Sequence, residues 1–249
     1  MTTKRIIPCL DIIDHRVVVG EQFKNLQEIE DPISLARYYE QSQADDLIIY
    51  EISGKVDAKK QFLTLIKNIR QIVTMPLTIG GGLKTIADIH QILDAGADRV
   101  SLNSAAINDP IFLQEAVQAF GQERIVLAID AKEIAPGRWH AFTSGGKKDS
   151  GLDVFAWAKQ AENIGVSEIV LNSIDSDGAK AGYDLELNEQ MAQTVNLPVI
   201  ASGGAGELQH FSDIFRQTNV SGALAASIFH RQQVTIQQVK QHLRDEKII

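Results

Sequence analysis

Ile6-Ile7-Pro8-Cys9-Leu10-Asp11 and Ile125-Val126-Leu127-Ala128-Ile129-Asp130 are two short apolar runs that each end in an aspartate. Nearly continuous apolar runs of this length are typical of parallel strands that are buried on both faces. The two runs lie about 120 residues apart, and such a repeat indicates two homologous halves. Two further pairs repeat at a similar offset: Pro76–Gly82 with Pro198–Gly204, and Val100–Ala105 with Ala223–Ile228.

The rest of the chain alternates between such runs and longer segments with helical periodicity. Strands are predicted to begin near Ile6, Leu47, Leu77, Val100, Ile125, Ile169, Val199 and Ala223. Helices are predicted over residues 33–41, 62–73, 85–94, 110–120, 152–164, 188–195, 208–217 and 234–243. Strict alternation predicts an α/β protein, and eight units favour a closed (βα)8 TIM barrel over an open sheet. Residues 1–249 then form a single domain with two homologous half-barrels, about 1–122 and 123–249.

The composition excludes several classes of function. The net charge of −8 makes the chain a poor non-specific binder of nucleic acid or of an anionic membrane. Its single cysteine, Cys9, excludes a disulfide framework and favours a reducing cytoplasm. We identify no membrane span and no signal peptide. The six histidines show no metal-ligand spacing, so we expect no metal and no cofactor.

Two long segments follow the two aspartate runs. Residues 12–30 and 131–150 read as loops, and long loops at the mouth of a barrel are usually lids or binding loops. The turn Ser144-Gly145-Gly146-Lys147-Lys148 lies in the second segment and could close over a phosphate group, although a solvated basic turn is an equal alternative.

Asp11 and Asp130 are the candidate catalytic residues. Both end a strand at equivalent places in the two halves, and the C-terminal ends of barrel strands surround the active site. The two carboxylates should therefore face each other and could divide acid and base work between them. The alternative is that each aspartate only caps the following loop.

Paired glycine runs predict two phosphate sites, one in each half. Glycine lets the backbone approach an anion closely, and unpaired N–H groups there bind phosphate. A turn that requires glycine is the alternative, but each run is followed by a strand that ends in a serine-bearing segment. The predicted phosphate residues are Gly81, Gly82, Asn103 and Ser104 in the first half, and Ser202, Gly203, Gly204, Ala226 and Ser227 in the second. Asp177 and Gly178, in the polar loop after the sixth strand, and Ser144 complete the predicted substrate site.

From end to end the chain resembles the cyclase subunits of imidazole glycerol phosphate synthase, from histidine biosynthesis. The motifs that carry the resemblance are Lys4–Asp11, Pro76–Gly82, Val100–Ala106, Leu127–Ala131, Ser173–Gly178, Gly182–Asp184, Ile200–Gly206 and Ala225–His230. The resemblance implies a lyase in which Asp11 and Asp130 are the catalytic pair. It closes an imidazole ring on a bis-phosphorylated ribulosyl-formimino aminoimidazole carboxamide ribonucleotide. The products are imidazole glycerol phosphate and aminoimidazole carboxamide ribonucleotide.

The resemblance also implies a partner. Ammonia comes from a glutaminase subunit in a heterodimer, docked at the opposite face of the barrel. A charged gate at that face matches Arg5, Asp46, Arg99 and Glu168 here, and Asp98 matches a position that meets the glutaminase. Surface ion pairs without such a role are the alternative for these residues.

Two positions depart from the family pattern. The first loop reads His15-Arg16-Val17-Val18-Val19-Gly20, so Val19 replaces a lysine associated with turnover. Glu51 replaces an aspartate after the second strand. Lys24 or Lys147 could compensate for the missing lysine.

Three other functions fit parts of the pattern. A paralogue linked to an amidotransferase of surface-sugar pathways would be expected to lose Asp11, which is present. The sister isomerase of the same pathway shares the half-barrel repeat but differs in the first strand and in the loop after the sixth strand. A binding-only barrel or scaffold would fit a chain in which Val19 marks lost catalysis.

Overall fold

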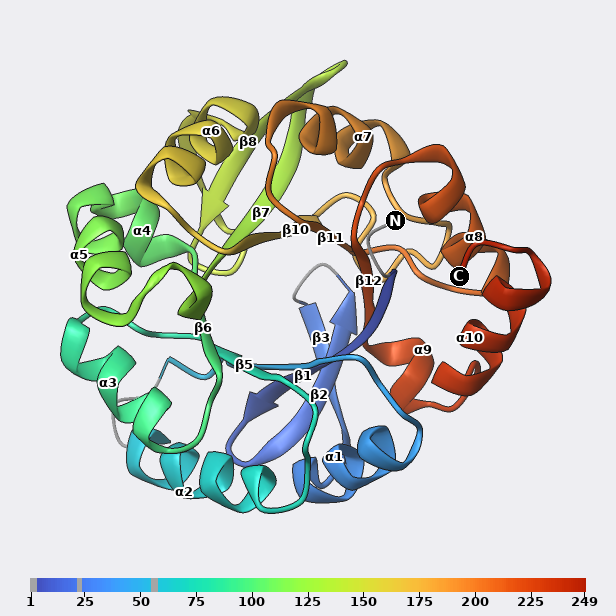
Figure 1. The fold of residues 1–249 in the computed structure, drawn as a ribbon, viewed down its shortest axis with the longest axis horizontal. Helices are drawn as coiled ribbons and strands as arrows, with labels where there is room; N and C mark the ends of the chain where they lie inside the picture. The colour runs from blue at the N-terminus through green and yellow to red at the C-terminus, as the bar shows by residue number, and fades with distance from the viewer. Residues whose placement is uncertain (1–3, 22–23, 55–57) are drawn as a thin grey trace.

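The structure is a computed structural model that describes residues 4–21, 24–54 and 58–249. Over these residues, eight parallel strands form a closed ring inside a layer of helices (Figure 1). The ring strands are β1 (Arg5–Ile13), β4 (Leu47–Glu51), β5 (Leu77–Gly80), β6 (Arg99–Leu102), β7 (Ile125–Ala135), β10 (Glu168–Ser173), β11 (Val199–Ser202) and β12 (Gly222–Ala225).

The pairing of β1 with β12 closes the ring, with Ile6 opposite Ala223. The other neighbours are successive ring strands; β7, for example, pairs with β10, with Leu127 opposite Ile169. This arrangement confirms the predicted (βα)8 barrel.

The helices cover the outside of the ring. They are α1 (Pro32–Gln41), α2 (Ala58–Arg70), α3 (Ile86–Asp94), α4 (Ser104–Asn108), α5 (Pro110–Phe120), η1 (Gln122–Arg124), α6 (Val154–Ile164), α7 (Leu185–Thr194), α8 (Leu208–Gln217), α9 (Ser227–His230) and α10 (Ile236–Asp245). Local sequence sets several starts. Asp31 caps α1 ahead of Pro32, and Thr85 begins α3 with a capping box completed by Asp88.

The core has two parts. Inside the ring, apolar side chains fill the barrel: Ile7, Cys9, Ile48, Val126, Val170, Ile200 and Leu224. A larger cluster lies between strands and helices, and includes Ile6, Leu10 and Ile49 with no exposed surface. Burying one such aliphatic side chain contributes roughly 1.5–3 kcal/mol. The barrel is therefore a packed body, and ligands must bind at its ends.

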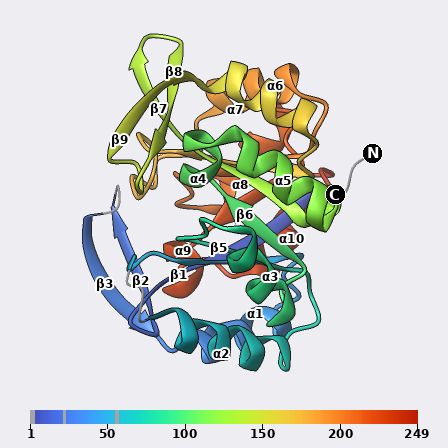
Figure 2. The ribbon, with the colours of Figure 1, turned by 90° about the vertical axis from the view of Figure 1, so that its left-hand side faces the viewer.

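The two long segments predicted as loops are largely β structure, which corrects that prediction. β2 (Arg16–Glu21) and β3 (Lys24–Glu30) form an antiparallel hairpin on β1, and β8 (Arg138–Thr143) and β9 (Lys148–Asp153) extend β7. Figure 2 shows both extensions on the same side of the barrel. The polar residues of these strands hide any strand pattern in the sequence. Both segments nevertheless follow the strands that carry Asp11 and Asp130, as predicted.

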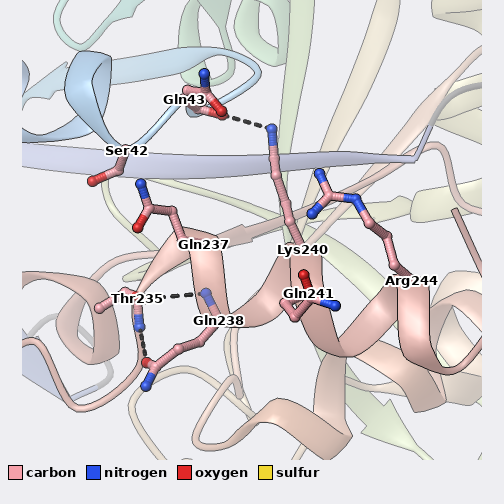
Figure 3. Close-up of a pocket in the computed structure, with 8 residues that line it drawn as sticks. All are labelled: Ser42, Gln43, Thr235, Gln237, Gln238, Lys240, Gln241 and Arg244. Carbon is pink, nitrogen blue, oxygen red and sulfur yellow. Dashed lines mark hydrogen bonds between the residues drawn. The ribbon is translucent and has the colours of Figure 1, made fainter.

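A shallow groove lies on the outside of the barrel between α1 and α10 (Figure 3). Its central side chain, Lys240, donates hydrogen bonds to the Gln43 carbonyl and to Oδ1 of Asp45, both at 2.6 Å. Oδ2 of Asp45 in turn accepts from the backbone N–H of Ile6 at 2.7 Å. The contacts in this groove therefore join the last helix to the first strand.

In the described part of the chain, the helices are all too short or too polar to cross a membrane.

Candidate active site

Asp11 and Asp130 lie at the C-terminal ends of the barrel strands, as predicted. Asp11 is opposite Tyr50 of β4, and Asp130 is opposite Asn172 of β10. Both aspartates are half-buried. A carboxylate from each half therefore stands at the same end of the barrel, below the two hairpins.

Two amide side chains hold Asp130. Nδ2 of Asn103 donates to Oδ2 at 2.9 Å, and Nδ2 of Asn172 donates to Oδ1 at 3.1 Å. Burial raises the pKa of Asp130 to about 6, while the two amide donors hold it down. Asn172 was absent from the predicted site residues. Its position at the polar end of an apolar strand was the available signal.

Asp11 is the more weakly acidic of the pair. Burial, then the charges of Asp177 and Asp130, raise its pKa to about 7. The pKa of Asp177 is raised to about 6 by burial and by Asp130. Both aspartates therefore have a pKa raised toward neutral pH. Such a pair can supply one proton donor and one proton acceptor.

The two glycine runs have the same construction in both halves. Gly81 has a φ of 95°, and a Cβ there would lie 2.0 Å from the Glu51 carbonyl oxygen. Gly203 has a φ of 91°, and a Cβ there would lie 2.7 Å from the Ser173 carbonyl oxygen. In each half only glycine lets the loop fold tightly over the end of the preceding strand.

The next strand of each half ends at a helix that no side chain caps. Asn103 precedes α4 with φ −129° and ψ −89°, and Ala226 precedes α9 with φ −121° and ψ −83°. Neither residue makes a side-chain cap, so the first N–H groups of both helices remain available to a ligand. We call Gly81, Gly82, Asn103 and Ser104 the first cradle, and Gly203, Gly204, Ala226 and Ser227 the second cradle.

A pocket joins the second cradle to Asp11. It is lined by Asp11, Val18, Val19, Gly20, Ile52, Asp177, Gly178, Ser202, Gly203, Gly204, Ala205, Leu224, Ala225, Ala226 and Ser227. Ser144 lies over the first cradle instead, where its backbone N–H donates to Oγ of Ser104 at 2.9 Å. The predicted substrate residues thus gather at the two sides of one barrel end.

The departures from the family pattern lie at this end too. Val19 is buried and lines the pocket beside the second cradle. Glu51 is half-buried, and its Oε1 accepts from the Ser53 backbone N–H at 3.1 Å. Lys147 is exposed. The side chain of Lys24, the other proposed substitute, lies outside the described residues.

At the opposite end, the four residues predicted to form a gate make a closed ring of ion pairs. Arg5 contacts Oδ2 of Asp46 at 2.6 Å and also pairs with Oε2 of Glu168. Arg99 contacts the other oxygen of each acid, Oδ1 of Asp46 and Oε1 of Glu168, both at 2.7 Å. The acids are 2 % and 5 % exposed. Burial outweighs the attraction of the two guanidinium groups and raises the pKa of Asp46.

Asp98 lies outside this ring, in the same hollow at the barrel end. Its Oδ2 accepts from the backbone N–H of Leu77 and from Nη1 of Arg70, both at 2.8 Å. Arg70 was absent from the predicted residues, because its contact depends on the reach of a side chain across a helix end.

Among the described residues, no group of three or more His, Cys, Asp or Glu side chains is placed to hold a metal ion.

Fold and site together define a (βα)8 barrel with paired acidic groups and paired glycine loops at the C-terminal ends of its strands. Residues 5–235 match the family described as histidine biosynthesis protein. The chain belongs to this family.

Three relatives that are each named imidazole glycerol phosphate synthase subunit HisF cover the full chain. The protein from Oceanobacillus iheyensis is 46 % identical over 248 residues, which is 100 % of this chain and 97 % of the relative. Those from Hydrogenobaculum sp. and Bacillus cereus are 44 % and 42 % identical, each over 100 % of this chain and 98 % of the relative.

Proposed function

We propose that this chain is the ammonia-dependent cyclase subunit of an imidazole glycerol phosphate synthase. It closes the imidazole ring on the bis-phosphorylated ribulosyl-formimino substrate and releases imidazole glycerol phosphate and aminoimidazole carboxamide ribonucleotide. The names of the HisF relatives support the reaction. One structural observation carries the proposal: two half-buried carboxylates, one from each half, share a barrel end with two glycine cradles of the same construction.

The two cradles suit a substrate with a phosphate group at each end. Both present backbone N–H groups without a side-chain cap, and such groups bind phosphate without needing a cationic side chain. In a chain with a net charge of −8, such backbone N–H groups supply the local attraction for an anionic ligand that the overall charge does not. The substrate then lies across the barrel end, with its reacting centre above the two aspartates.

The aspartates supply proton transfer. Ring closure by ammonia removes protons from nitrogen and delivers protons to the groups that leave. Asp130, held ionised by Asn103 and Asn172, is the base. Asp11, with its pKa raised to about 7, is the acid. General acid–base catalysis is most efficient when the pKa of the group lies near the working pH.

A glutaminase is the proposed source of ammonia. Ammonia is a nucleophile only when it is unprotonated, and a docked source with a closed route avoids bulk protonation. The ring of Arg5, Asp46, Arg99 and Glu168 closes the end of the barrel opposite the aspartates. Asp98 lies beside the ring on the face proposed to meet the partner.

Two assays test the proposal. The isolated chain is expected to turn over the bis-phosphorylated substrate with ammonium salt and to leave glutamine unused. Addition of a cognate glutaminase is expected to produce glutamine-dependent product. Absence of ammonium-dependent turnover would refute the cyclase, whereas glutamine hydrolysis by the isolated chain would refute the division between the two subunits.

A further inference from the structure

Helix α9 (Ser227–His230) begins within the second cradle and is only one turn long. Its own backbone bonds form a single turn: the Ala226 carbonyl accepts from the N–H groups of Phe229 and His230, each at 3.0 Å, and the Ser227 carbonyl accepts from Arg231 at 3.0 Å. The carbonyls of Ile228 and Phe229 accept from the turn that follows, residues 232–234. A single helical turn is unfavourable by itself, because several residues are ordered for each hydrogen bond that forms. The position of the cradle N–H groups at Ala226 and Ser227 therefore depends on what holds α9 from outside.

Apolar contacts hold two side chains of α9. Ile228 and Phe229 are each 1 % exposed, and the Phe229 ring stacks on Phe211 of α8 with centroids 5.8 Å apart. Apolar burial is non-directional, so it keeps the helix against the core without fixing its rotation. A directional hydrogen bond restricts the rotation more closely than this packing does.

His230, the last residue of α9, makes that contact. Its Nδ1 lies 2.5 Å from the hydroxyl oxygen of Tyr39 in α1, and both side chains are buried. Burial lowers the pKa of His230 to about 4, so the ring is neutral, with one nitrogen free to accept. Its Nε2 is buried without a hydrogen bond, and the backbone of Cys9 lies close enough to raise the pKa of the ring. Cys9 stands two residues before Asp11.

The first half has no such tether at the equivalent place. Three residues after Ser104, helix α4 carries Ile107, which is buried and apolar. Three residues after Ser227, α9 carries His230. At this helix position, the described residues therefore place a polar side chain only in the second half.

We propose that His230 and Tyr39 are positioning residues for the phosphate group in the second cradle, because their hydrogen bond fixes the rotation of α9. The inference rests on the proposed function of the cradle. Replacing both members of a buried polar pair with apolar groups is close to neutral for stability, so stability alone does not account for this pair.

The test compares Tyr39→Phe, His230→Phe and the double variant. Each single variant leaves one buried polar group without a partner, so each is expected to lower Tm. The loss of one directional hydrogen bond is expected to raise KM for the bis-phosphorylated substrate about fivefold, with kcat within about twofold. The double variant is expected to recover Tm and to retain the raised KM. A KM that returns to the wild-type value together with Tm would overturn the inference, because it would show a structural role only.

A second hydroxyl–histidine pair supplies the control. Oγ of Ser212 in α8 lies 2.5 Å from Nε2 of His242 in α10, and neither residue lines the pocket beside the second cradle. Ser212→Ala is expected to lower Tm and to leave KM unchanged. An equal rise in KM for Ser212→Ala would also overturn the inference, since any loss of stability would then produce it.

Binding of inorganic phosphate separates this inference from the cyclase proposal. The measurement is the protection of the Ala226 and Ser227 amide protons from exchange on addition of phosphate. Wild-type protein is expected to show protection, and Tyr39→Phe is expected to need about fivefold more phosphate for the same effect. This readout does not require turnover. Equal protection in both proteins would refute the positioning role even if the cyclase activity is present.

Discussion

Asn103 donates a hydrogen bond of 2.9 Å to Oδ2 of Asp130 and so links the two halves of the site. Asn103 lies at the first cradle, whereas Asp130 is the acidic residue of the second half. A phosphate group bound beside Asn103 would therefore act on the side chain that holds Asp130, the proposed base. Asn172 gives Asp130 a second amide donor from the neighbouring strand β10.

Asp130→Asn and Asp11→Asn are expected to lower kcat far more than they change KM. Asparagine keeps the volume of aspartate but cannot exchange a proton. Such steps contribute about 10²–10⁴-fold to the rate. Steady-state kinetics with ammonium salt as the nitrogen source are the measurement. Near-normal turnover in Asp130→Asn would exclude it as the base.

Asp11→Asn is also expected to stabilise the fold at neutral pH. The pKa of Asp11 is about 7 in the folded chain against an ordinary value of 3.8, so the folded state holds this proton more tightly than the unfolded state. Ionised Asp11 therefore destabilises the wild-type fold progressively as pH rises from about 4 to about 7. Denaturant unfolding at pH 8 should favour Asp11→Asn by at most about 4 kcal/mol, since each of the roughly three pKa units is worth about 1.4 kcal/mol, and the difference should disappear near pH 4.

Asp149→Asn is the control for this measurement. Asp149 is exposed, and a hydrogen bond from the Gly151 backbone N–H and the contact with His140 lower its pKa. Its carboxylate therefore contributes in the opposite direction, and the variant should show no gain at pH 8. A gain equal to that of Asp11→Asn would show that burial of Asp11 is not the cause.

The barrel could be predicted from the sequence because its strands are continuous apolar runs and its helices have clear periodicity. The short helices α4 and α9 were missed, since five and four residues are too few for a period to show. Strand β3 was missed because Lys24–Glu30 reads Lys-Asn-Leu-Gln-Glu-Ile-Glu, with only two apolar residues.

Part of the candidate site could also be predicted from the sequence, because the chain repeats itself by halves. Repetition marked Asp11, Asp130 and the glycine runs, because each feature occurs twice at a near-constant offset. The role of Asn172 depends on the pairing of β10 with β7, which are separated in the chain by two further strands and a helix. Sequence pattern alone does not define such a neighbour.

Val19→Lys is expected to raise kcat/KM about tenfold, since a hydrogen bond to a charged group contributes roughly 1.5–3 kcal/mol. Val19 lines the pocket that contains Ala226 and Ser227, so an ammonium group there would meet the second phosphate group. Val19→Met adds length without charge and should leave the rate unchanged. An unchanged or lower rate in Val19→Lys would mean that the first hairpin no longer serves the substrate in this way.

Arg99→Met is expected to destabilise the fold by roughly 3 kcal/mol, because Arg5 alone would remain to pair two buried carboxylates. Arg99 makes one contact with each acid, so its loss opens the ring on two sides. Glutamine-dependent turnover with the partner should then fall more than ammonium-dependent turnover, since an open ring admits water and lets ammonia escape.

Arg216→Met is the matched control. Its pair with Glu246 is 48 % and 35 % exposed, and such surface pairs contribute at most about 1 kcal/mol. Equal destabilisation of the two variants, or an equal fall in both activities, would make the ring an ordinary surface feature rather than a gate.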